Sequence, residues 1–319
     1  MNKSRLAIVI PAYKSTYFDQ ALNSIAEQSC HDFTLYIGDD NSSDNLESIV
    51  DKYVGRINIV YKRFDSNLGG KDLVAQWERC VDMVNEEDWV WLFSDDDTMD
   101  ENCVFEFYNS LKETGACYDL YHFNVDVINS ESRIISNSAN FDYPKILSCI
   151  DFYKKRLNGS LPCYVVEYVF RKQAFLNVER FQSFDLAWGS DVATWAKLSY
   201  SKGIYTIPKG RVKWRYSNVN ISPNISKIVL KRKINTVAEM LNWFKVFFKD
   251  RGINVSLFNF KMLLVRLSFF SLYLNNVILI NVFDKYFELN KGYKFYRFPL
   301  LFFVFTYLSS YKIYKLITK

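Results

Sequence analysis

The sequence has few of the residues that build histidine-based sites. Only two histidines, His31 and His122, occur among its 319 residues. That number argues against a His-rich zinc site and against a Ser-His-Asp triad. The six cysteines include no C-x-x-C pair, which predicts free buried thiols in a reducing cytoplasm. Any chemistry must therefore depend mainly on carboxylates.

The sequence also lacks a long apolar segment. The longest uncharged runs are Leu267–Phe283, 17 residues with three asparagines, and Phe298–Tyr311, 14 residues with a proline. A membrane-spanning helix needs about 20 mostly apolar residues, so both runs are marginal. The first apolar run, Leu6–Ile10, is too short for the core of a signal peptide and predicts a buried strand instead.

Charge divides the chain into two parts. Residues 1–226 hold 24 basic and 31 acidic residues, a net of −7, whereas residues 227–319 hold 16 and 4, a net of +12. We expect a catalytic domain over 1–226 and a basic, aromatic, helical region over 227–319. Helices of that composition suit the interface of an anionic membrane. The alternative is a soluble helical subdomain that packs on the catalytic domain.

Apolar strands alternate with amphipathic helices in the first hundred residues. Strands are expected at 6–10, 33–37, 57–61 and 89–93, with helices between them. This alternation predicts an α/β fold with a Rossmann-like, mainly parallel sheet flanked by helices. Residues 103–226 are less regular, with a strand-like run at 164–170 and a helix expected from 190 to about 200. In such sheets, ligands bind beyond the carboxyl ends of the strands.

Two acidic clusters follow predicted strands. Asp95, Asp96 and Asp97 come directly after the run WVWLF, and their mutual repulsion would be relieved by Mg²⁺ or Mn²⁺ bound to a diphosphate. The alternative is a solvated acidic turn. These three aspartates form the second cluster along the chain, and the first begins at Asp39 and Asp40. The first cluster is either a helix-capping turn or a site where a carboxylate accepts hydrogen bonds from a nucleotide base.

Together these motifs resemble a known family. The pattern comprises IVIPAYK (8–14), a helix with Ser24 and Gln28, DFTLYIGDDNSSD (32–44), the Asn67–Gly70 segment and WLFSDDD (91–97). In this order they are similar to family 2 glycosyltransferases of the GT-A fold. The resemblance is close over residues 6–100 and loose over 101–220. It implies a nucleotide-binding half at 1–100 and an acceptor half at 101–226.

The resemblance implies roles for individual residues. Asp40 would accept from the base, and Asp39 would support its loop. Asp95 would contact the ribose side, and Asp96 or Asp97 would coordinate the metal; because the register of D-D-D against D-x-D is ambiguous, all three are candidate ligands. The other expected nucleotide contacts are Pro11, Ala12, Tyr13 and Lys71. Lys71 could equally be a plain surface lysine, and Lys14 departs from the family's usual asparagine.

The expected catalytic base is Asp191. Inverting members of the family use a carboxylate from an E-D or similar pair that opens a helix, and Ser190 here replaces the first acid of that pair. A positioned carboxylate can collect the proton that the acceptor hydroxyl loses. The alternative is that Asp191 only complements a helix N-terminus. Downstream, residues 213–218 resemble the family's basic, aromatic loop over the diphosphate.

The sequence thus predicts an inverting, metal-assisted glycosyltransferase that uses a nucleotide-sugar, with UDP preferred. We expect a glycan or lipid-linked acceptor, no nucleic acid partner, and a cytoplasmic enzyme attached peripherally to the inner face of the plasma membrane. Two other readings stay open. One is a metal-dependent nucleotidyl- or phosphotransferase, although residues 11–18 lack a glycine-rich phosphate loop. The other is a non-catalytic, membrane-attached carbohydrate-binding protein.

Overall fold

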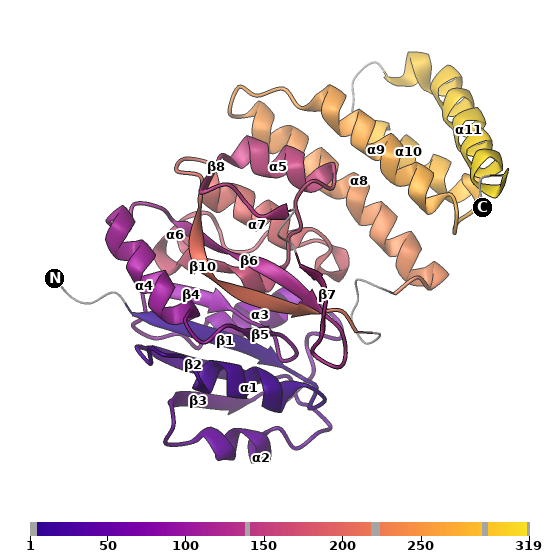
Figure 1. The fold of residues 1–319 in the computed structure, drawn as a ribbon. Coiled ribbons are helices and arrows are strands. Elements are labelled where there is room, and N and C mark those ends of the chain that lie inside the picture. The colour runs from indigo at the N-terminus through magenta and orange to yellow at the C-terminus, as the bar shows by residue number, and fades with distance from the viewer. Residues whose placement is uncertain (1–4, 138–140, 218–223, 289–292, 318–319) are drawn as a thin grey trace. The chain divides into compact units, whose positions relative to one another are not determined.

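The computed structural model describes residues 5–137, 141–217, 224–288 and 293–317. It divides into two compact units (Figure 1). The first unit comprises Met1–Ser183 and Ser190–Val219, and the second comprises Phe184–Gly189 and Asn220–Lys319. Every candidate site residue named above lies in the first unit.

The first unit is built on one sheet of ten strands in the order β3-β2-β1-β4-β9-β6-β10-β5, with β7 on β6 and β8 on β10. The strands are β1 (Leu6–Ala12), β2 (Phe33–Asp39), β3 (Asn58–Arg63), β4 (Trp89–Leu92), β5 (Thr98–Met99), β6 (Leu120–Ile128), β7 (Ile134–Asn137), β8 (Ile146–Leu147), β9 (Tyr168–Arg171) and β10 (Ile204–Arg215).

Most strands of this sheet run in one direction. β1 pairs in parallel with β2 and β4, β2 with β3, and β6 with β10. β9 lies antiparallel between β4 and β6, so those two strands share a direction. The carboxyl ends of β1, β2, β4 and β10 therefore lie at one edge of the sheet. The predicted mainly parallel α/β sheet is confirmed.

Helices cover this sheet with their apolar sides. In α1, for example, Phe18, Leu22 and Ile25 recur at helical spacing and are fully buried. The helices of the first unit are α1 (Phe18–Ala26), α2 (Glu47–Val50), α3 (Leu73–Val81), α4 (Cys103–Thr114), α5 (Cys149–Leu157), α6 (Lys172–Asn177) and α7 (Ser190–Ser199), with short 3₁₀ turns at Asp51–Tyr53 and Val165–Glu167.

The family motif with Ser24 and Gln28 has a structural role in this fold. The Gln28 amide donates to the carbonyl oxygens of Ser24 and Asp100, and its own oxygen accepts from the Val104 amide at 2.9 Å. Gln28 is nearly fully buried. It therefore fastens the segment after the second acidic cluster onto α1.

The main departure from the predicted elements is at 164–170. The expected strand is a 3₁₀ turn over Val165–Glu167 followed by β9, because the Glu167 carboxylate accepts from the Tyr164 amide and closes the turn. The helix predicted from 190 to about 200 is confirmed as α7.

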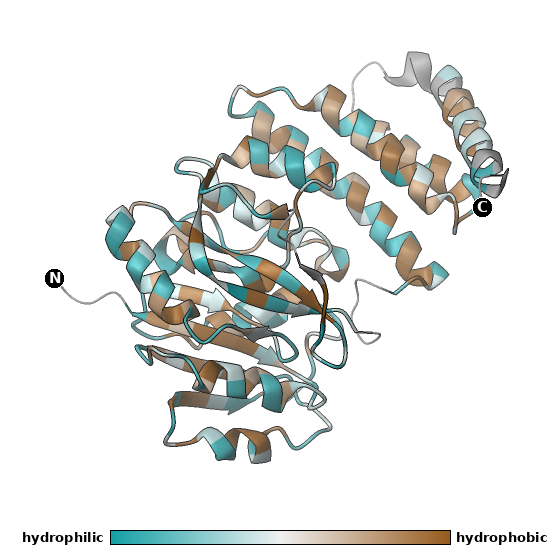
Figure 2. Ribbon diagram, viewed as in Figure 1, coloured by the Kyte–Doolittle hydropathy of each residue, from teal (hydrophilic) through white to brown (hydrophobic). Residues whose placement is uncertain are grey.

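The second unit is helical in its described part. It contains a 3₁₀ turn at Asp185–Ala187 and the helices α8 (Lys227–Lys249), α9 (Ser256–Phe270), α10 (Asn276–Glu288) and α11 (Tyr293–Ile317). Figure 2 shows hydrophobic residues distributed along all four helices. Within the described ranges, none of these helices combines the length and hydropathy needed to cross a bilayer.

Candidate active site

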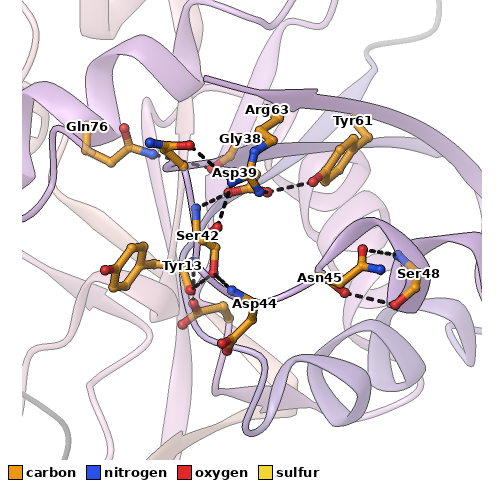
Figure 3. Close-up of polar contacts among 12 residues, drawn as sticks. Tyr13, Gly38, Asp39, Ser42, Asp44, Asn45, Ser48, Tyr61, Arg63 and Gln76 are labelled. Atoms are coloured by element: carbon orange, nitrogen blue, oxygen red, sulfur yellow. Dashed lines mark hydrogen bonds and ion pairs between the residues drawn. The ribbon is translucent and has the colours of Figure 1, made fainter. Parts of the chain in front are cut away.

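The first acidic cluster is held by basic and hydroxyl side chains. The Asp39 carboxylate is fully buried and accepts from the Ser42 amide at 2.8 Å, the Tyr61 hydroxyl at 2.6 Å and the Arg63 guanidinium at 2.9 Å (Figure 3). Arg63 also donates to the Ser42 carbonyl oxygen. Asp39 thus closes the turn after β2 against β3, and its support of a nucleotide-binding loop stays a prediction.

Asp40 fastens a second loop. Its carboxylate accepts from the amides of Leu68 at 2.7 Å and Gly69 at 2.8 Å, and it forms an ion pair with Arg79. A Cβ at Gly69 would lie 2.7 Å from the Asp40 carboxylate, so only glycine allows this approach. The Asn67–Gly70 segment of the family pattern is therefore positioned by Asp40. Its contact with a nucleotide base stays a prediction.

The end of the first cluster orders the loop after β1. The Asp44 carboxylate accepts from the amide of Ser15 at 2.9 Å and from its hydroxyl at 2.6 Å, and these bonds lower the pKa of Asp44. The Ser42 hydroxyl donates to the carbonyl oxygen of Tyr13 at 2.5 Å. Residues 13–15 and 42–44 consequently form one connected rim at the edge of the sheet (Figure 3).

Asp95, in the second cluster, binds the backbone of the same rim. Its carboxylate accepts from the amides of Tyr13 at 2.8 Å and Lys14 at 2.9 Å. Burial and the neighbouring Asp96 raise the pKa of Asp95 to about 6. The two acidic clusters therefore meet at residues 13 and 14, as expected for turns that follow the adjacent parallel strands β1, β2 and β4.

Asp96 and Asp97 occupy different surroundings. Asp96 is half-buried and accepts from the Ser94 hydroxyl, while Asp97 is buried and accepts from the Arg215 amide at 2.6 Å. Burial is the main reason that the pKa of each carboxyl is raised, and Asp96 raises that of Asp97 further. Ionisation of these groups therefore costs free energy unless a cation is nearby.

The predicted basic loop at 213–218 is wrong for its first three residues. Lys213, Trp214 and Arg215 form the end of β10, and Arg215 is fully buried. Its guanidinium donates to the carbonyl oxygens of Asp96 and Asn129 and stacks 4.2 Å over the Tyr17 ring. Arg215 thus holds the second cluster in place through its bonds to Asp96 and Asp97. Asn218 lies outside the described residues.

Asp191 lies at the start of α7, and its side chain is partly buried rather than exposed to solvent. Its carboxylate accepts from the Val192 amide at 2.8 Å and contacts the Cys163 thiol at 3.8 Å. Burial raises the pKa of Asp191, and the charge of Arg156 on α5 opposes this shift. A carboxylate with a raised pKa is a better proton acceptor than an exposed one, which suits a general base.

A buried carboxyl, Glu167, lies behind Asp191. Its Oε1 accepts from the Tyr164 amide at 3.2 Å and is 3.6 Å from the His122 ring. Full burial raises the pKa of Glu167 to about 8 and lowers that of His122 to about 3. Both groups are therefore neutral near pH 7.

A series of contacts connects the second acidic cluster to Asp191. Arg215, which binds Asp97, follows Trp214, whose ring stacks on Tyr164 with centroids 4.1 Å apart. Tyr164 follows Cys163, which contacts Asp191. The charge of Asp97 also contributes to the raised pKa of Tyr164. The fold thus gathers residues 97 and 191 around one aromatic pair, although more than ninety positions separate them in the sequence.

Whether this site suits a divalent ion follows from its donors. In the described ranges, no three His, Cys, Asp or Glu side chains converge in a metal-binding arrangement. Mg²⁺ and related ions are commonly held by one or two carboxylates, with water and substrate phosphates completing the shell. Two half-buried carboxylates with raised pKa values, Asp95 and Asp96, fit that kind of site. A ligand set of all three aspartates stays a prediction.

The remaining predicted nucleotide contacts lie on this rim or near it. Pro11 and Ala12 end β1, Tyr13 is 43% exposed beyond them, and Lys71 is exposed in the turn before α3. Four residues around these clusters carry no sequence motif that predicts them: Arg63, Arg79, Tyr164 and Glu167. Nothing in the sequence distinguishes them from other charged or aromatic residues.

A comparison with protein families agrees with this geometry. The model described as glycosyl transferase family 2 matches residues 7–175, more than half of the chain. The chain belongs to glycosyl transferase family 2. Membership of this family favours glycosyl transfer over the phosphotransferase reading.

TarS, the poly(ribitol-phosphate) β-N-acetylglucosaminyltransferase of Staphylococcus aureus strains Mu50 and MW2, is 29% identical to this family 2 enzyme over 129 residues. The match spans 39% of this chain but only 20% of the length of TarS.

Crystal structures of TarS are similar over 97% of the chain. The fragment in complex with UDP-GlcNAc has a TM-score of 0.56 at 17% identity and is covered over 88% of its length. A second structure of S. aureus TarS has a TM-score of 0.60 at 16% identity, with 54% of that chain covered. This likeness confirms the predicted GT-A fold.

Proposed function

We propose that this enzyme transfers a sugar from a UDP-sugar to a hydroxyl group of a glycan or lipid-linked acceptor, with inversion at the anomeric carbon. Family membership supports glycosyl transfer, and the relative crystallised with UDP-GlcNAc makes that donor the first to test. The acceptor of TarS, poly(ribitol-phosphate), suggests a polyol-phosphate or polysaccharide chain as the acceptor class.

The single observation that carries the mechanism is the contact series from Asp97 to Asp191. It links Asp191 and the second acidic cluster through the Tyr164–Trp214 pair, which supports a general base on one side and a cation-binding cluster on the other. An acceptor and an activated sugar must meet between two such groups for a single displacement to occur.

In that displacement Asp191 removes the proton from the acceptor hydroxyl. The oxygen then forms a bond to the anomeric carbon, and the bond from that carbon to the diphosphate oxygen breaks. UDP leaves with the electron pair, and Asp191 ends the step protonated. Its raised pKa favours this transfer because the neutral carboxyl is stabilised by burial. No covalent intermediate with the enzyme is needed.

The rim formed by residues 13–15 and 42–44 would bind the nucleotide. Asp95 holds the backbone of Tyr13 and Lys14 on the rim, and Asp40 holds the separate loop at Leu68 and Gly69, so both backbones are fixed before the donor binds. Asp95 and Asp96 would hold a Mg²⁺ or Mn²⁺ ion, which would neutralise charge on the leaving diphosphate.

The test of this function is Asp191→Asn, assayed with UDP-GlcNAc, Mn²⁺ and a panel of polyol-phosphate and oligosaccharide acceptors. The wild type should release UDP in an acceptor-dependent way. The variant should bind UDP with nearly the same affinity in calorimetry and lose about 10³-fold or more in turnover, since a general base of this kind contributes about 10²–10⁴-fold.

Asp185→Asn is the matched control, because Asp185 forms an exposed ion pair with Arg232 in the second unit. It should retain turnover within about twofold. Unchanged turnover in Asp191→Asn would remove Asp191 from the mechanism, and release of UDP without any glycosylated product would argue against the proposed acceptors.

A further inference from the structure

Helix α9 of the second unit carries apolar side chains on two opposite faces. On its inner face Met262, Leu263 and Leu267 are buried, and the Asn259 amide donates to the Leu241 carbonyl oxygen of α8 at 2.7 Å. This face is the ordinary buried side of an amphipathic helix.

The outer face is also apolar. Leu257 is 81% exposed, Val265 and Phe269 are each 50% exposed, and Tyr273, just past the helix, is 41% exposed. These positions follow one another at intervals of four or eight residues, and so lie on one side of the helix. From Leu257 to Phe269 the stripe runs for about 18 Å along the helix. A helix on a water-facing surface normally has charged residues there.

The charged residues of the sequence segment that carries this stripe are of one sign, between Asp250 before it and Asp284 after it. Residues 251–283 contain no Asp or Glu, and their charged residues are Arg251, Lys261 and Arg266. Lys261 is exposed and lies between Leu257 and Val265 on the outer face. A partner that covers this stripe must therefore offer apolar groups to the stripe and negative charge to the basic residues beside it.

A second copy of the chain does not meet that requirement. It would bring the same stripe and the same basic residues, so self-association through this face would place like charges together. A bilayer with anionic headgroups does meet it, because it accepts apolar side chains below the headgroups and basic side chains beside them.

We propose that the outer face of α9, formed by Leu257, Lys261, Val265, Phe269 and Tyr273, binds the surface of an anionic lipid membrane. The helix lies in the plane of the interface. Its apolar side chains enter the boundary between headgroups and acyl chains, and the stem of Lys261 lets its ammonium group reach the phosphates. This inference is independent of the proposed catalytic mechanism.

The experiment is flotation of the full chain with vesicles of phosphatidylcholine alone or mixed with phosphatidylglycerol. We expect binding to the mixed vesicles at least about tenfold stronger than to the neutral ones, and weaker at high salt. Val265→Glu/Phe269→Glu should abolish binding to both, and Lys261→Glu should reduce only the preference for anionic vesicles.

Val54→Glu is the matched control, since Val54 is an exposed valine of the first unit. It should float like the wild type, and all variants should keep their circular dichroism and their affinity for UDP. Equal flotation of the double variant, or no flotation of the wild type, would overturn the proposal. So would a wild-type dimer that the double variant dissociates, because a second copy would then cover the stripe.

Discussion

The two acidic clusters of the first unit consist of the same residue type at the same edge of the sheet, yet their surroundings differ. Asp39 and Asp40 form ion pairs with Arg63 and Arg79 and accept backbone amides. Asp95, Asp96 and Asp97 accept from amides and one serine hydroxyl, and burial raises the pKa of all three. The first cluster is therefore a structural clamp, and the second has unused capacity for a cation.

The largest effect should come from Asp40→Ala. It would leave the partly buried Arg79 without its carboxylate and the amides of Leu68 and Gly69 without an acceptor. Removing one partner of a buried ion pair costs about 3–5 kcal/mol. Urea unfolding should show a loss in that range, with Asp40→Asn intermediate. A loss below about 1 kcal/mol would mean that the clamp is not structural.

Asp96→Asn should act in the opposite way. The free energy of unfolding should stay equal or rise, because the variant removes a poorly solvated charge and keeps an oxygen for the Ser94 hydroxyl. Turnover with Mn²⁺ should fall by about 10²–10³-fold, the usual loss when charge stabilisation is removed from a site. Calorimetry should show that Mn²⁺ no longer strengthens UDP binding. If Mn²⁺ still does so, Asp96 is not a metal ligand.

Glu167 is a further buried carboxyl, outside both clusters, whose pKa is raised by burial. Its pKa is about 8 in the folded protein and 4.5 in the unfolded reference, so between those values the folded state keeps a proton that the unfolded state has lost. The free energy of unfolding should therefore decrease as pH rises, by at most about 1.4 kcal/mol per pH unit.

Glu167→Gln removes this titration and keeps an acceptor for the Tyr164 amide. We expect its stability relative to the wild type to increase steadily from pH 5 to pH 8 in urea unfolding. Parallel pH profiles for the two proteins would contradict the neutral state of Glu167. Glutamine is neutral like the protonated Glu167, and it leaves the stacking of the Tyr164 ring on Trp214 in place. Turnover at pH 7 should therefore change little.

The sequence was sufficient to locate both clusters, since polar residues after buried parallel strands converge at one edge. It could not distinguish the clamp from the cluster whose carboxyls have raised pKa values. That difference depends on Arg63 and Arg79, which lie 24 and 39 residues from their partners, and on burial that only the packed fold creates. Arg215 shows the same limit: a basic residue predicted in a loop is fully buried at a strand end.

The smallest effect should come from Arg63→Ala, which tests the more exposed ion pair of the clamp, between Asp39 and Arg63. The Arg63 side chain is 46% exposed, against 22% for Arg79, so solvent screens its ion pair with Asp39 more strongly. The Tyr61 hydroxyl and the Ser42 amide still satisfy the Asp39 carboxylate in the variant.

We expect Arg63→Ala to lower the free energy of unfolding by about 1 kcal/mol, and Arg79→Ala by at least twice as much. A double-mutant cycle with Tyr61→Phe should then show coupling, because each residue would have to replace the other's bond to Asp39 Oδ2. Equal losses of unfolding free energy for Arg63→Ala and Arg79→Ala would mean that the exposure of the arginine does not determine the strength of its ion pair. Additive losses in the cycle would mean that Arg63 and Tyr61 stabilise Asp39 independently.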